Sequence, residues 1–136
     1  IKVSQQEVNA MVMDALDDVG LKHTVNMMPA ELSGGMRKRI ALARTLILKP
    51  ELILYDEPTT GLDPITGREI IELMKEIQQK YNTSSLIISH DINCVRMASD
   101  RVIVLAEGRC HANGPFEELL KSTDPVVKQF FESQIS

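Results

Sequence analysis

Apolar residues near the start of the chain recur at three- and four-residue steps, the spacing of one face of an α-helix. The pattern predicts a helix that begins at the capping-box sequence of residues 4–7 and is closed by Gly20. It predicts a second helix from the expected N-cap, Ser33, to about Leu48, before Pro50. The first third of the chain is therefore expected to be helical.

Short apolar runs then alternate with amphipathic helices. Residues 52–55 and 85–89 are apolar runs bounded by turn signals, which is typical of strands buried on both faces of a parallel sheet. The pair Asp63 and Pro64 supplies an N-cap and a first-turn proline to the helix between them. A short helix over residues 92–98 and a third strand near 101–106 follow. This order predicts an α/β fold.

The sequence divides into three parts. Residues 1–48 form the helical part, residues 49–112 an α/β core, and residues 113–136 two short C-terminal helices that follow Gly-Pro and Asp-Pro pairs. Glu107 and Gly108 predict a hairpin turn at the end of the core.

Composition excludes several classes of protein. The 136 residues hold 15 Lys plus Arg against 19 Asp plus Glu, a formal net charge of −4, so we expect no nucleic-acid partner. Aromatic residues are 4% of the chain, which predicts an aliphatic core. Two cysteines, Cys94 and Cys110, form no disulfide framework and favour a reducing compartment. The sequence has no apolar run near the roughly 18 residues of a membrane span.

Two adjacent acids, Asp56 and Glu57, follow the first apolar run. Parallel sheets bind ligands beyond the carboxyl ends of their strands. There, Asp56 can hold Mg²⁺ through its water shell, and Glu57 can accept a proton from an attacking water. His90 ends the next strand and is expected on the same rim. Taken singly, these residues also fit a solvated acidic turn and a structural histidine.

Two glycines follow a serine in residues 32–36 (LSGGM), at the start of the predicted second helix. Such a helix start exposes backbone N–H groups without side-chain obstruction, and together with the Ser33 hydroxyl it can bind an anion. A plain serine N-cap before a flexible loop is the alternative. The basic run at residues 37–39 is interpreted as a solvated helix face.

Four strings stand in a diagnostic order: LSGG at 32–35, LILYDEPT at 52–59, GLDP at 61–64 and SHD at 89–91. Together they resemble the signature loop, the Walker B strand, the D-loop and the switch histidine of the ATP-binding-cassette (ABC) ATPases. The resemblance covers essentially the whole chain. It implies a P-loop NTPase-like three-layer fold, present here in part, with ATP and Mg²⁺ as cofactors.

The resemblance also implies a role for each matching residue. Asp56 would coordinate Mg²⁺ through water, Glu57 would be the general base, and His90 would contact the γ-phosphate. In a homodimer, ATP bound to the opposite subunit would be gripped by Leu32, Ser33, Gly34, Gly35 and Met36. The two composite sites would be coupled by Gly61, Leu62 and Asp63. Met36 stands where the family more commonly has Gln, so one polar contact to the nucleotide is in question.

A phosphate-cradling G-x-x-x-x-G-K-[ST] string is absent from the 136 residues, so the chain resembles the C-terminal half of a cassette. We expect it to be inactive alone and to leave an apolar strand face or an open strand edge. The resemblance implies ATP hydrolysis that drives transport through a separate permease, at the cytoplasmic face of the inner membrane. The Met-containing signature and the tail at 124–131 are similar to Mla-type (toluene-tolerance) cassettes, which favours phospholipid as cargo.

Two other readings remain open at this point. ABC-type ATPases of DNA repair or chromosome maintenance share the signature and Walker B features, but a long coiled coil precedes their signature half. The front helix here shows no sustained heptads, and the string at 59–64 looks like the transporter version. A non-catalytic pairing module would describe this chain by itself.

Overall fold

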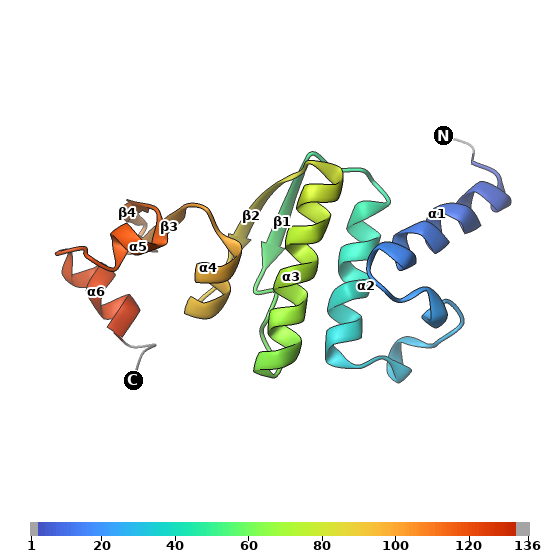
Figure 1. The fold of residues 1–136 in the computed structure, drawn as a ribbon, viewed down its shortest axis with the longest axis horizontal. Helices are drawn as coiled ribbons and strands as arrows, with labels where there is room; N and C mark the ends of the chain where they lie inside the picture. Colours follow the sequence, from blue (N-terminus) through green and yellow to red (C-terminus); the bar gives the residue numbers. More distant parts are fainter. Residues whose placement is uncertain (1–2, 133–136) are drawn as a thin grey trace.

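The computed structural model describes residues 3–132. In chain order its elements are α1 (Gln5–Asp18), η1 (Lys22–Thr24), η2 (Pro29–Glu31), α2 (Gly34–Leu46), β1 (Leu52–Asp56), α3 (Pro64–Tyr81), β2 (Ser84–Ile88), α4 (Ile92–Ala98), β3 (Val102–Ala106), β4 (Arg109–Gly114), α5 (Phe116–Leu119) and α6 (Pro125–Glu132). Figure 1 shows an elongated molecule with α1 at one end, β1, β2 and α3 in the middle, and β3, β4, α5 and α6 at the other end.

The predicted helix starts are confirmed by their caps. The Ser4 hydroxyl accepts a hydrogen bond from the Glu7 N–H at 3.3 Å, and the Ser4 N–H donates to the Glu7 carboxylate at 2.8 Å. Asp63 caps α3 by accepting hydrogen bonds from the N–H groups of Ile65 and Thr66, with Pro64 in the first turn. Helix α2 ends at Leu46, two residues before the predicted end, because the chain tightens there and Lys49 takes a positive φ of 48°.

Strands β1 and β2 are parallel, and Asp56 pairs with Ile88 at their carboxyl ends. The α/β fold with a parallel sheet is therefore confirmed. The prediction that both strand faces are buried is wrong for the residues described. In Figure 1, α3 and α4 lie on one side of this sheet, and Ile53 on that side is 2% exposed. Four apolar side chains point to the uncovered side and are 52–68% exposed: Leu52, Leu54, Leu86 and Ile88.

The third predicted strand, β3, pairs with β4 in an antiparallel hairpin separate from the parallel sheet. The turn between them is made by Glu107 and Gly108, with φ of 50° and 72°. Two positive φ values in succession are typical of the type I′ turn of two-residue hairpins, so the turn predicted from these residues is confirmed.

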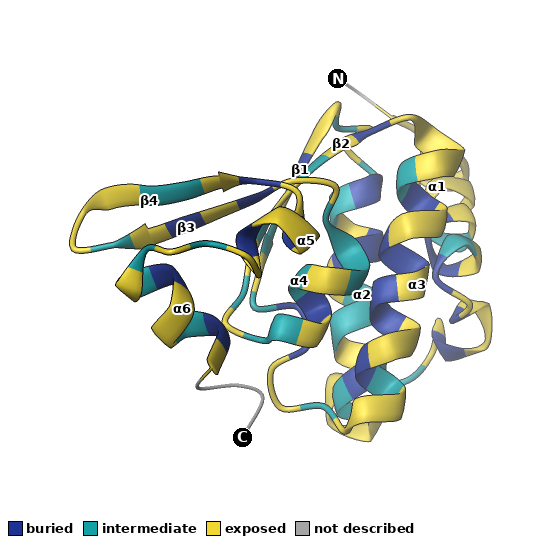
Figure 2. Cartoon of the chain, turned by 60° about the vertical axis from the view of Figure 1, so that its left-hand side comes forward, coloured by how far each residue is buried: buried dark blue, intermediate teal, exposed yellow. Residues whose placement is uncertain are grey.

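Two hydrophobic clusters hold the described residues together. The first joins α1, α2, α3 and β1, and it includes Val19, Leu42 and Ile77. The second lies between the β3–β4 hairpin and helices α5 and α6, and it includes Val104, Val127 and Phe131. Figure 2 shows the buried residues as stripes along the helices. Both clusters are largely aliphatic, as the composition predicts, and the first supports the helices that carry the site.

Candidate functional site

The carboxyl ends of β1 and β2 bring the predicted acids and histidine together. The Glu57 N–H donates to the Ile88 carbonyl at 2.9 Å, which continues the β1–β2 pairing one residue past Asp56. His90 Nδ1 lies 2.8 Å from Glu57 Oε1, although 33 residues separate the two in the chain. The shared rim expected from parallel strands is thus observed, with a direct contact that the sequence did not predict.

Four donors surround the Glu57 carboxylate. Besides the His90 ring, the His90 N–H donates to Oε1 at 3.2 Å, and the hydroxyls of Thr60 and Ser89 donate to Oε2 at 3.2 and 3.4 Å. The side-chain hydrogen bond from His90 is the main cause that lowers the pKa of Glu57. The same bond, followed by the carboxylate's charge, raises the pKa of His90. The pair therefore favours an ionised Glu57 beside a protonated His90.

Glu57 also has an unusual backbone. Its φ is +46°, in the left-handed region that side-chain-bearing residues seldom occupy. Its carbonyl oxygen accepts a hydrogen bond from Lys38 Nζ at 3.0 Å, contributed by α2. The sequence did not predict this contact or the ones made by Thr60 and Ser89. The local sequence around Glu57 does not contain Lys38, which lies 19 residues earlier.

The basic run at residues 37–39 is not a solvated face, contrary to the prediction. Arg37 is exposed and donates to the Leu32 carbonyl at 2.7 Å. Lys38 and Arg39 are half-buried, and Arg39 donates to the Val19 carbonyl at 3.1 Å, which joins α2 to the end of α1. A signal was present, because Lys38 lies three residues after the buried Gly35 and four before the buried Leu42, on one helix face.

Asp56 is exposed, and its carboxylate makes no hydrogen bond or ion pair with any other described residue. Within residues 3–132, no group of three or more His, Cys, Asp or Glu side chains could hold a metal ion. Mg²⁺ in phosphate-handling sites is typically held by one or two carboxylates, water and the substrate phosphates. A free carboxylate such as that of Asp56 fits this kind of site, whereas a metal cage built from protein alone does not form here.

The LSGGM segment (residues 32–36) lies against the start of α3. The Ser33 hydroxyl accepts from the Met36 N–H at 3.1 Å, as an N-cap does. A Cβ at Gly34 would lie 3.4 Å from Leu62 Cδ2, and a Cβ at Gly35 would lie 2.6 Å from Thr66 Cγ2. The two predicted segments, 32–36 and 61–63, are therefore in contact within one chain, and Gly35 must be glycine for α2 to approach α3 this closely.

The side chain of Asp63 forms the N-cap of α3. Its Oδ1 accepts from the N–H groups of Ile65 and Thr66, both at 3.0 Å, and its Oδ2 accepts from the Thr66 hydroxyl at 2.6 Å. The side-chain bond from Thr66 is the main cause that lowers the pKa of Asp63. Within this chain, the Asp63 carboxylate therefore serves the helix start.

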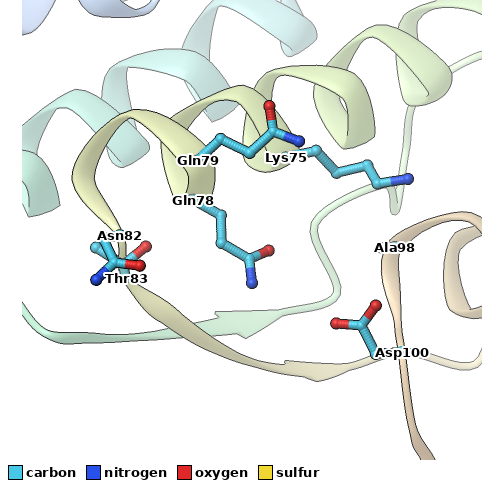
Figure 3. Close-up of a pocket in the computed structure, with 7 residues that line it drawn as sticks. All are labelled: Lys75, Gln78, Gln79, Asn82, Thr83, Ala98 and Asp100. Atoms are coloured by element: carbon cyan, nitrogen blue, oxygen red, sulfur yellow. The ribbon is translucent and has the colours of Figure 1, made fainter.

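A cavity of about 300 Å³ lies away from this rim, between the end of α3 and the segment before β3. Figure 3 shows Gln78 and Asp100 pointing into it from opposite sides. Thr83, directly before β2, also lines it, so the cavity is at the opposite end of that strand from His90. It contains none of the predicted site residues.

Among the residues described, no helix combines the length and the apolar character needed to cross a membrane.

Comparisons with known proteins agree with the motifs. Residues 1–60 match the family model described as "ABC transporter". The intermembrane phospholipid transport system ATP-binding protein MlaF of Haemophilus influenzae is 40% identical over 127 residues, 93% of this chain and 48% of the relative. This chain therefore spans about half the length of that relative.

Two solved structures share the fold. The cbiO1 protein of Clostridium perfringens, part of an ABC transporter complex, has a TM-score of 0.79 and 32% identity over 99% of this chain and 50% of that one. The ATP-binding cassette MJ0796, in a dimeric post-hydrolysis state bound to ADP and Pi, has a TM-score of 0.71 and 32% identity over 85% of this chain and 50% of that one. With four ordered motifs, a matching fold and these relatives, the chain belongs to the ATPase domains of ABC transporters.

Proposed function

We propose that this chain is the part of an ABC-transporter ATPase that carries the signature segment and the catalytic carboxylate, and that the intact cassette hydrolyses ATP to drive transport. The contact between Glu57 and His90, at 2.8 Å on the rim of the parallel strands and beside the free Asp56, carries the proposal. Such a rim is where parallel sheets act on their ligands.

In this proposal Glu57 is the general base that takes a proton from the attacking water. As the structure stands, its carboxylate is engaged by His90, so His90 must turn away before Glu57 can accept that proton. The turn disturbs little packing, since the His90 side chain is 68% exposed. Once it has turned, the imidazole is available to contact the γ-phosphate.

Asp56 is the proposed carboxylate of a Mg²⁺ site, acting through the ion's water shell. When bound, the ion would neutralise charge on the phosphates, and positioning with charge stabilisation is most of phosphoryl-transfer catalysis. Asp56 is the suitable acid because Glu57 beside it is held by four donors.

The LSGGM segment is proposed to bind ATP held by a second copy of the cassette, at the start of α2, where Ser33 is exposed. Backbone N–H groups at a helix N-terminus favour a phosphate. The residues proposed to bind this ATP are Leu32, Ser33, Gly34, Gly35 and Met36. The residues proposed to couple the two copies are Gly61, Leu62 and Asp63. A dimer among the structural relatives supports this arrangement.

A separate membrane permease is the proposed transport partner, with the ATPase attached at the cytoplasmic face of the inner membrane. The name of MlaF supports phospholipid as the cargo, and the relatives do not favour the DNA-repair alternative. The genes beside this one test the cargo: a permease gene and a gene for a lipid-binding periplasmic domain are expected.

The catalytic proposal is tested in the intact cassette with Glu57→Gln, which keeps the shape of the side chain and removes the base. ATP binding should persist, hydrolysis should be lost, and ATP should trap the dimer. Glu72→Gln is the matched control because Glu72 is exposed on α3 and makes no polar contact with the other described residues. Hydrolysis by Glu57→Gln at a rate near that of the wild type would refute the assignment.

A further inference from the structure

Lys38 connects the LSGGM segment to the backbone of Glu57. It lies on α2, one turn after the two glycines, and its Nζ donates to the Glu57 carbonyl oxygen at 3.0 Å. The side chain is half-buried. Within residues 3–132, this carbonyl is the one polar partner of the Lys38 ammonium, and no carboxylate pairs with it. A half-buried charge committed to a backbone oxygen is unusual, because lysine normally stays solvated or pairs with an acid.

The carbonyl it holds belongs to a residue in a costly conformation. With φ at +46°, the Glu57 backbone persists only when its surroundings determine it. Three backbone contacts do so: the Lys38 ammonium and the Thr60 N–H both bind the Glu57 carbonyl oxygen, and the Glu57 N–H binds Ile88. Lys38 is the one contributed from outside the two strand ends.

We propose that Lys38 is a positioning residue for Glu57, which ties the helix of the LSGGM segment to the catalytic carboxylate of the same chain. The inference rests on the proposed function, in which Glu57 is the base. The Lys38 ammonium holds the Glu57 carbonyl in place. This fixes the backbone of Glu57, so that its carboxylate is directed to the rim before substrate arrives.

The link also gives a path between the two composite sites. Gly35 is packed against Thr66 with no space for a Cβ, so the start of α2 lies tightly against α3. If the phosphate of one site displaced α2 as a rigid helix, Lys38 would move with it and would shift the backbone of Glu57, which acts in the other site. Each chain would in this way report nucleotide engagement by its LSGGM segment to its own base.

The test uses the intact cassette with two substitutions of Lys38. Lys38→Met removes the donor and keeps an unbranched stem, and Lys38→Arg keeps a cationic donor. Arg44→Met is the matched control because Arg44 is exposed on the same helix and has no polar partner among the described residues. The readouts are kcat and KM for ATP hydrolysis, and amide hydrogen exchange across residues 57–62.

We expect Lys38→Met to lower kcat by about tenfold or more, the scale of one lost hydrogen bond to a charged group, with KM changed less than about twofold. Lys38→Arg should recover most of kcat, and Arg44→Met should leave both parameters unchanged. Exchange across residues 57–62 should quicken in Lys38→Met alone. If that variant fails to fold, Lys38→Gln, a shorter neutral donor, should give an intermediate kcat at unchanged KM.

Several outcomes would overturn the inference while the proposed function stands. They are a wild-type kcat in Lys38→Met or Lys38→Gln, an equal loss in Lys38→Arg, and a rise in KM at constant kcat, which would place Lys38 in nucleotide binding. A wild-type cassette without ATPase activity would instead refute the proposed function. In that case unchanged hydrogen exchange in Lys38→Met would still overturn the role of Lys38 in holding Glu57.

Discussion

Gly35→Ala should separate α2 from α3, whereas Gly34→Ala should not. The two glycines are adjacent and both lie in the first turn of α2, yet their surroundings differ. A Cβ at Gly35 would lie 2.6 Å from Thr66 Cγ2, and one at Gly34 would lie 3.4 Å from Leu62 Cδ2, the far end of a flexible side chain. The pair therefore separates steric contact from the general effect of replacing glycine in a helix.

The cost at Gly35 follows from the geometry. The two carbons must move apart by about 0.8 Å to reach 3.4 Å, the lower end of ordinary contact. Overpacking of this kind costs about 1–3 kcal/mol, and the better helix propensity of alanine returns up to about 1 kcal/mol. We expect the free energy of unfolding to fall by about 1–2 kcal/mol in Gly35→Ala and to change by less than about 0.5 kcal/mol in Gly34→Ala.

The measurement is urea unfolding of residues 1–136 at one fixed protein concentration, because association would otherwise shift the midpoint. A rescue variant sharpens it. Thr66→Ser removes the methyl group that a Cβ at Gly35 meets and keeps the hydroxyl that donates to Asp63 at 2.6 Å. In the Gly35→Ala background it should restore about 1 kcal/mol. Equal losses at both glycines, or no restoration by Thr66→Ser, would refute the close-contact argument.

Three further predictions concern the site and the exposed sheet. In the intact cassette, Ser33→Arg should block ATP hydrolysis by placing a bulky cation at the start of α2, while ATP binding to a monomer barely changes. A large loss of monomer affinity for ATP in equilibrium binding would place Ser33 in the nucleotide site of its own chain and refute binding across the dimer. The free energy of unfolding lost in His90→Ala should be greatest between about pH 4.5 and 6.5, the ordinary pKa values of Glu57 and His90. The pKa of Glu57 is lowered in the folded state, so the stability that this carboxylate contributes is lost as pH falls through its folded pKa. The pKa of His90 is raised, so the stability that the imidazole contributes is lost as pH rises through its folded pKa. Urea unfolding across the pH range checks this, and a flat difference would contradict it. Residues 1–136 alone should show no thermal shift with millimolar Mg-ATP. They should self-associate at micromolar concentration in light scattering, and Leu54→Lys should associate less. A monodisperse wild-type monomer would contradict the argument from the exposed sheet.

Helix starts were predictable because their determinants are local. The capping box at Ser4 and the cap at Asp63 act within three residues, so the sequence contains all the groups involved. The turn at Glu107 and Gly108 is local in the same sense. The end of α2 was missed by two residues, because no strong stop signal stands between Leu46 and Pro50.

The site was predictable to the level of topology and no further. Parallel strands place their carboxyl ends on one edge, which was enough to bring Glu57 and His90 together. The contacts of Lys38 with Glu57 and of Gly35 with Thr66 depend on how α2 packs against α3 and β1, over separations of 19 and 31 residues. Basic residues on a helix are usually solvated, and this general preference predicted a solvated Lys38. Its side chain is instead half-buried against the Glu57 carbonyl.

The strands show why an apolar run alone does not identify its neighbours. The run at residues 52–55 indicates burial on both faces, yet within residues 3–132 the helices cover one face. Full burial of a Leu or Ile side chain contributes about 1.5–3 kcal/mol, so covering four side chains that are 52–68% exposed would contribute roughly 4–7 kcal/mol. That is comparable to the whole stability of many domains, about 5–15 kcal/mol. A segment that packs on this face, whether from the same protein or from a second copy, would therefore decide how stable the rim of Asp56, Glu57 and His90 is.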